Sequence, residues 1–174
     1  MKKDPNTSWL GPPLVTAVGE LDNGGSIEAV MLLLRYGAVA RVALPTAISA
    51  NNIEAVRMLL AAGADLGEES EEGGGPFKLC VLHGTAEMMA MLPRCGGRRN
   101  IDRASGYSGL NALGAAVDYL NLPIVKLLLK AGADPMVEDF DHQIACECLP
   151  KRNETNAQVW DEIAALLPAR KPRG

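Results

Sequence analysis

Apolar residues recur at helical spacing in the stretch Leu110–Pro135, and this pattern predicts two short helices placed back to back. In its second half, Ile124, Leu127 and Leu128 fall at positions i, i+3 and i+4, so they share one face of a helix. Gly132 follows the last periodic residue, where a left-handed C-terminal cap favours glycine. We therefore expect a helix that stops at Gly132 and buries Leu127 and Leu128.

The same helical pattern occurs four times, in segments 26–38, 52–65, 85–97 and 121–134. Each copy contains a stop glycine with an apolar residue seven positions before it, in the pairs Val30 and Gly37, Val56 and Gly63, Met89 and Gly96, and Val125 and Gly132. Three copies carry a glutamate in the first turn (Glu28, Glu54, Glu87), where a carboxylate is favourable. Pro123 takes that place in the fourth copy, and proline is tolerated in a first turn.

A shorter helix precedes each of these segments, with expected copies at 12–18, 43–48, 76–81, 112–117 and 145–149. Their anchoring residues are Leu14, Leu44, Phe77, Leu113 and Cys146, at successive spacings of 30, 33, 36 and 33 residues. A single helix pair of this size cannot bury its apolar face, whereas a stack of pairs forms one continuous core. The chain is therefore expected to be a helical repeat protein.

A period of about 33 residues, small-residue inner helices, Leu-rich outer helices and the endings Gly63–Asp65 and Gly132–Asp134 resemble the ankyrin-repeat family. The resemblance implies an all-α solenoid of helix-turn-helix units with finger loops. The expected divisions are an N-terminal tail and cap at 1–10, repeats at 11–42, 43–75, 76–111, 112–144 and 145–168, and a disordered tail at 169–174. The family's T-P-L-H-x-A motif is eroded here, so we expect packing to supply more of the coupling between repeats.

The ends of the stack are expected to be capped by apolar side chains. Trp9 and Leu10 are predicted to cover the first repeat. A closing helix at 157–167 is predicted to present one apolar side, formed by Trp160, Ile163, Leu166 and Leu167.

Composition narrows the class of protein. The 174 residues are 48% hydrophobic but only 4% aromatic, so the core must consist mostly of Leu, Ala, Val and Met. A net charge of −4 argues against a general nucleic-acid binder, which usually carries a basic domain. No apolar run approaches the ~20 residues that span a bilayer, and the start of the chain lacks a secretory signal. We expect a cytoplasmic protein that is monomeric on its own.

Four cysteines raise the question of disulfides and metals. Their spacing fits no zinc motif, so they are interpreted as free thiols, mostly buried, and no metal or cofactor is expected. They are Cys80, Cys95, Cys146 and Cys148.

Ankyrin-like stacks bind partners along a concave side formed by finger tips and inner helices, and this resemblance defines the candidate contact residues. The inner helices offer His83, Asp118 and Tyr119. The fingers alternate in charge from acidic to basic to acidic, and they offer Glu68, Glu69, Glu71, Glu72, Arg98, Arg99, Arg103, Tyr107, Glu138, Asp139, Phe140 and Asp141. Tyrosine and arginine are the types most often found at binding hot spots, so Tyr107, Tyr119 and Arg103 rank first.

Each candidate also has a purely structural interpretation. Any of these side chains can be a solvated loop residue, and the acidic run at 68–72 can be a solubilising loop or can steer a basic partner. The basic finger can pair with its acidic neighbours, and it is a weak phosphate site because those neighbours repel phosphate.

The sequence therefore predicts a non-enzymatic module that binds a folded protein partner. Because almost the whole chain is repeat, the simplest role is an inhibitor that masks its partner, for example an immunity protein that neutralises a toxin. An adaptor that bridges two proteins is the alternative within the class. An enzyme or small-molecule binder with a pocket around His83, Asp118 and Tyr119 is the alternative outside it, although nucleotide-binding and nucleophile motifs are missing from the sequence.

Overall fold

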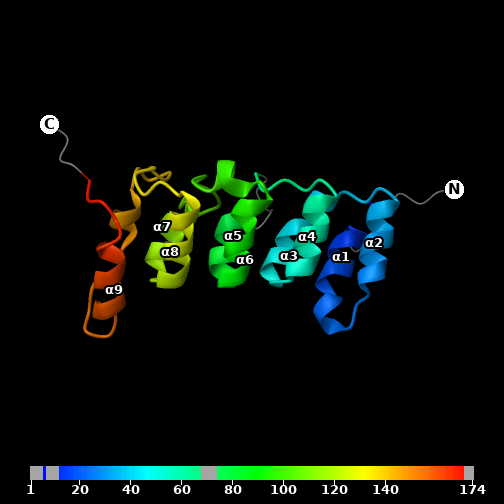
Figure 1. The fold of residues 1–174 in the computed structure, drawn as a ribbon, viewed down its shortest axis with the longest axis horizontal. Helices are drawn as coiled ribbons and strands as arrows, with labels where there is room; N and C mark the ends of the chain where they lie inside the picture. The colour runs from blue at the N-terminus through cyan, green and yellow to red at the C-terminus, as the bar shows by residue number, and fades with distance from the viewer. Residues whose placement is uncertain (1–5, 7–11, 68–73, 171–174) are drawn as a thin grey trace.

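The computed structural model describes residue 6 and residues 12–67 and 74–170, and within these residues every regular element is helical. Paired helices stand side by side in one row from the N-terminal to the C-terminal end (Figure 1). The pairs are α1 (Pro13–Gly19) with α2 (Ile27–Arg35), α3 (Leu44–Ser49) with α4 (Ile53–Ala61), α5 (Pro76–His83) with α6 (Ala86–Met91), and α7 (Ala112–Asp118) with α8 (Leu122–Ala131). The last pair is the 3₁₀ helix η5 (Ala145–Cys148) with α9 (Ala157–Ala164).

The first helix of each pair forms an inner row, and the second forms an outer row. In the inner row α1 contacts α3, α3 contacts α5, α5 contacts α7, and α7 contacts η5. In the outer row α6 contacts α8, and α8 contacts α9. A 3₁₀ turn, η1 (Leu21–Asn23), joins the two helices of the first pair. Three others lie between successive pairs: η2 (Ala40–Ala43), η3 (Leu92–Cys95) and η4 (Gly97–Asn100). The core lies between the two rows and runs the length of the stack.

The stop glycines confirm the repeat register. Gly37, Gly63, Gly96 and Gly132 all adopt left-handed backbone angles, with φ of 90°, 93°, 94° and 97°. The apolar residues seven positions earlier (Val30, Val56, Met89 and Val125) are all buried. Because a side chain at positive φ is strained, glycine marks the end of each outer helix, and the sequence pattern located these ends correctly.

Most of the outer helices begin with a side-chain cap that the hydrophobic pattern did not reveal. The side-chain oxygen of the residue before the helix accepts a hydrogen bond from the backbone N–H three residues ahead. The accepting residues are Ser26 for α2, Asn52 for α4, Thr85 for α6, Asn111 for α7 and Asn121 for α8. Such a bond satisfies one of the amide groups that a helix leaves unpaired at its start. The inner helix α7 shares this device, and its cap is the shortest of the five, with 2.7 Å between Asn111 Oδ1 and Gly114 N.

Replacing Asn111 by alanine is expected to lower the free energy of unfolding by about 1–2 kcal/mol. The side chain is buried, so its loss leaves the Gly114 amide without its bond and without ready access to water. Urea unfolding followed by circular dichroism measures the effect. Ser26→Ala is the matched control, since that cap is exposed and longer, at 3.4 Å. Equal losses of unfolding free energy in the two variants would contradict the claim that a buried cap contributes more than an exposed one.

Hydrogen bonds couple neighbouring repeats in addition to the packing that the eroded motif led us to expect. Many link residues about one repeat apart. Asn51 Oδ1 accepts from Thr85 N at 3.0 Å, and Asp102 Oδ1 accepts from Asp134 N at 2.8 Å. Ser105 Oγ accepts from Gly75 N at 2.9 Å. Polar bridges therefore join neighbouring repeats alongside the shared apolar core.

Three details of the helix predictions were wrong. The fifth inner helix is a single 3₁₀ turn, because Pro150 follows it closely and cannot donate a hydrogen bond to continue a helix. Leu127 is only half-buried, whereas Leu128 is fully buried. On the closing helix Ile163 and Leu167 are buried and Trp160 donates to Pro150 O at 2.8 Å, but Leu166 is exposed. The predicted covering residues Trp9 and Leu10 lie outside the described residues.

Candidate partner-binding surface

The third finger (residues 96–110) and the fourth finger (residues 135–143) contact each other and expose two aromatic side chains. Phe140 N donates to Gly109 O at 3.3 Å. Gly109 has a φ of 64°, and a Cβ there would lie 2.7 Å from Phe140 Cβ, so only glycine allows this approach. Phe140 remains 65% exposed and Tyr107 is 95% exposed. Exposed apolar side chains that gather on one surface can mark a site of protein interaction.

Beside these tips lies an open hollow of about 370 Å³ between α7 and η5. Its wall brings Asp118, at the end of α7, together with Asp141 and Ser108 from the two fingers; the other lining residues are Leu110, Gln143, Glu147, Cys148, Leu149 and Pro150. Tyr119 follows Asp118 in the chain and is 61% exposed. We define the inner surface as Tyr107, Asp118, Tyr119, Phe140 and Asp141, all of which are exposed.

Asp139 was predicted to contact a partner, but the structure gives it an internal role. Its side chain is only 6% exposed, and its Oδ1 accepts from Asp141 N at 2.8 Å and Gln143 N at 2.9 Å. These bonds hold the turn that contains His142, whose φ is 59°. Asp139 therefore stabilises the fourth finger from inside, and its burial leaves little of it for a partner to contact.

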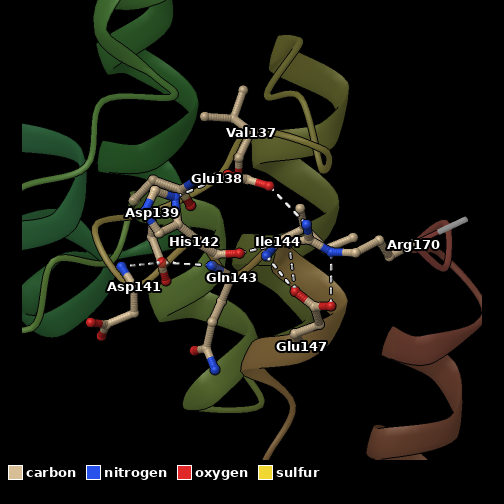
Figure 2. Close-up of polar contacts among 10 residues, drawn as sticks. Val137, Glu138, Asp139, Asp141, His142, Gln143, Ile144, Glu147 and Arg170 are labelled. Atoms are coloured by element: carbon tan, nitrogen blue, oxygen red, sulfur yellow. Dashed lines mark hydrogen bonds and ion pairs between the residues drawn. The ribbon is translucent and has the colours of Figure 1, made fainter. Parts of the chain in front are cut away.

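Glu138 belongs to a polar cluster that fixes the C-terminal segment on the fourth finger (Figure 2). Arg170 donates to Glu138 Oε1 at 2.7 Å, to both oxygens of Glu147 at 2.9 and 3.0 Å, and to His142 O at 2.6 Å. The hydrogen bond from Arg170, followed by that from Ile144 N, lowers the pKa of Glu147. The expectation of a disordered tail from 169 therefore fails at Arg170, and residues 171–174 lie outside the described residues.

The three arginines of the basic finger do not form one patch. Arg98 Nε donates to Ala131 O at 3.1 Å, which places this side chain against the end of the outer helix α8. Arg103 Nη1 donates to Gly67 O on the preceding finger. Arg99 is exposed on η4. The acidic residues Glu68, Glu69, Glu71 and Glu72, which were predicted to form the second finger, lie outside the described residues.

The alternative of a catalytic pocket is not supported by the geometry. The hollow that contains Asp118 has neither His83 nor Tyr119 on its wall. His83 is exposed at the end of α5. In residues 12–67 and 74–170, together with residue 6, no group of three His, Cys, Asp or Glu side chains is arranged to hold a metal ion.

A buried lysine supports the third finger, and nothing in the sequence pattern indicated it. Lys78 on α5 is 7% exposed, and its Nζ donates to Ser105 O at 2.5 Å and Ser108 Oγ at 2.6 Å. These bonds position the finger that carries Tyr107. Lysine is usually a surface residue, so the burial of Lys78 is shown by the fold and not by the sequence.

All four cysteines are free, but their environments differ more than expected. Cys80 is buried and Cys95 is exposed, whereas Cys146 and Cys148 are half-buried. Burial raises the pKa of Cys80 to about 12. Burial, assisted by the charges of Asp139 and Asp118, also raises the pKa of Cys148 to about 12. The prediction of free thiols is confirmed, but full burial holds for Cys80 only.

Iodoacetamide at mildly alkaline pH is expected to label Cys95 first and to leave Cys80 and Cys148 largely unmodified in the folded protein. The thiolate is the reactive form, and a raised pKa keeps a thiol protonated. Mass spectrometry of peptides from a labelling time course measures the order. A Cys95→Ser variant serves as the control, and labelling of Cys80 as fast as Cys95 would contradict this placement.

The fold and its repeated contacts define a helical-repeat binding protein, and comparison with known proteins identifies the family. A family model described as "Ankyrin repeats (3 copies)" matches residues 44–139, more than half of the chain. The chain belongs to the ankyrin-repeat family. It is also 35% identical over 84 residues to "Ankyrin repeat and SOCS box protein 3" of Bos taurus, an alignment that covers 48% of this chain and 16% of that relative.

Ankyrin repeats indicate a protein–protein interaction module. In the described part of the chain, no helix has the length and apolar character needed to span a membrane.

Proposed function

We propose that the chain binds a folded protein partner through the inner surface and acts by masking that partner. The observation that supports this most strongly is the exposure of Tyr107, Tyr119 and Phe140, each of which is the chain neighbour of a residue that lines an acidic hollow. The chain contains only two Trp, three Tyr and two Phe, so three of its few aromatic residues face water here. Rigid aromatic side chains give a large contact area at low entropic cost, which is why they serve as anchors in interfaces.

The charge of the hollow points to a basic partner. Asp118 and Asp141 lie on its wall without a cation from the described residues in contact with either carboxylate. A lysine or arginine side chain of the partner would complement the charge of these two carboxylates. Complementary charge of this kind raises the rate of association and the specificity more than the affinity.

Masking is proposed because it is the simplest way in which binding through this surface would change what the partner does. An inhibitor, of which a toxin-neutralising immunity protein is one example, meets this description. We propose that the chain works in the cytoplasm and is monomeric before it binds. The adaptor role is favoured only by a separate pocket, which lies on the outer helices α6 and α8.

Affinity capture from a native lysate, followed by an assay of the captured protein, tests the proposal. The expected result is a partner that binds the wild type and loses its own activity in the complex. The partner should bind the double variant Tyr107→Ala/Tyr119→Ala about 30-fold more weakly, since loss of a hot spot costs about 2 kcal/mol or more. Arg57→Ala, an exposed change on α4, is the control and should bind normally.

Two results would contradict the proposal. Unchanged affinity of the double variant would show that the inner surface is not the contact site. Full activity of the partner in the complex would reject masking, although the binding site itself would stand.

A further inference from the structure

A second pocket lies on the outer row of helices, at the junction of the third and fourth repeats. It encloses about 360 Å³, within the range of ligand pockets in proteins. The wall is formed by α6, η3, η4 and α8, through Met89, Ala90, Pro93, Arg94, Arg98, Leu127, Lys130 and Ala131. Apart from Arg98, none of these residues was a predicted contact.

The floor of this pocket is apolar. Met89 is 1% exposed and belongs to the core, and Leu127 is half-buried beside it. Leu127 is thus left partly open because it faces the pocket, whereas its neighbour Leu128 packs inside the stack with no exposure. The floor has no aromatic ring, so it offers no surface on which a nucleic-acid base would stack.

The rim is basic. Arg94, Arg98 and Lys130 are all exposed, and the wall contains no carboxylate. Elsewhere cations find acidic partners, as Arg152 does with Asp161 at 2.7 Å, whereas no ion pair joins these three to an acid in the described residues. Arg98 is held in place by its bond to Ala131 O, which caps the carbonyl end of α8. This bond uses Nε and leaves the two terminal nitrogens available for a carboxylate.

We propose that this outer pocket binds an acidic peptide segment of a protein partner, with an aliphatic side chain on Met89 and Leu127 and carboxylates at Arg94, Arg98 and Lys130. Charge complementarity indicates that the peptide is acidic, because three cations gather at the rim in a chain whose net charge is −4. The inner surface is acidic and this outer pocket is basic, so the two sites select partners of opposite charge. One chain can then hold two partners at once, as an adaptor does.

A fluorescein-labelled peptide with two leucines between pairs of glutamates provides the probe, and fluorescence anisotropy measures its binding. We expect saturable binding that weakens as salt rises from about 50 to 200 mM, because the rim is exposed to solvent. The same peptide with glutamine in place of glutamate should bind at least about tenfold more weakly.

Charge reversal locates the site. Arg94→Glu/Lys130→Glu should weaken peptide binding at least about tenfold, whereas Arg57→Glu on α4 alters the charge outside the pocket and should leave binding unchanged. Arg94 and Lys130 are exposed, so their replacement should leave the fold intact. If thermal unfolding shows otherwise, Arg94→Gln and Lys130→Gln carry the same test singly. The variant Tyr107→Ala/Tyr119→Ala should keep full affinity for the peptide, which separates this proposal from the masking proposal.

The proposal is overturned if the peptide shows no saturable binding up to about millimolar concentration, the weak limit of specific association. It is also overturned if Arg57→Glu weakens binding as much as the pocket variant does. Binding of octanoate without binding of the peptide would assign the pocket to small carboxylates and reject a peptide segment.

Discussion

Leu128→Ala is expected to lower the free energy of unfolding by about 2–5 kcal/mol. Leu128 lies on α8, has no exposed surface, and belongs to the core that runs through the stack. Truncation removes buried methyl groups and leaves a cavity that neighbouring helices fill only in part. Urea denaturation followed by circular dichroism measures the loss.

Leu127→Ala is the matched control, because it makes the same chemical change on the same helix at a half-buried position. Its cost should stay below about 2 kcal/mol, since only part of the side chain leaves water on folding. A loss below about 1 kcal/mol for Leu128→Ala would show that α8 does not pack as described.

Gly97→Ala is expected to destabilise the protein by about 1–3 kcal/mol through overpacking. Gly97 is buried in η4, and a Cβ there would lie 2.7 Å from Phe77 Cζ, 2.8 Å from Leu92 O and 2.9 Å from Leu66 Cδ1. One of these contacts is backbone, so relief requires the turn itself to move. The midpoint of thermal or urea unfolding measures the effect.

Gly19→Ala gives a control of opposite sign. Gly19 ends α1, and a Cβ there meets only Thr46 Cγ2, at 3.7 Å. Alanine has the higher helix propensity, so this variant should be neutral or gain up to about 1 kcal/mol. Equal changes in stability for the two glycine variants would contradict the crowding described around Gly97.

The outer helices and their ends were predictable because the residues that specify them lie close together in the sequence. A leucine-rich face at helical spacing and a glycine at the left-handed stop are both contained within a single repeat. The same reasoning located Val125 and Gly132 from one copy and then Val30 and Gly37 from a copy that is more eroded. Repetition supplies several estimates of one pattern, which compensates for weak signals in any single copy.

The polar interior and the placement of the arginines were not predictable, because they depend on contacts between repeats. Asp139 and Lys78 look like surface residues, yet each is buried where it supports a finger. Arg98 was grouped with Arg99 and Arg103 by sequence, but the turn at η4 places it against the next outer helix. No periodic pattern encodes the direction in which a loop side chain leaves its turn.

The structure brings some of the predicted contact residues together, and their contact with a partner stays a prediction. Asp118 and Asp141 were proposed from the family resemblance, and they share the wall of one hollow. Tyr107, Tyr119 and Phe140 are exposed, as a binding surface requires. The outer pocket was not predictable from the sequence, because residues of two neighbouring repeats form its wall and no pattern within one repeat brings them together.

Hydrogen–deuterium exchange of the chain, free and bound to its captured partner, tests the central claim most directly. The account predicts slower exchange on binding at 105–110, 117–120 and 138–143, the backbone of the inner surface, and unchanged exchange in α2 and α4. Slower exchange confined to the outer helices, with no change around Tyr107 and Asp118, would contradict it.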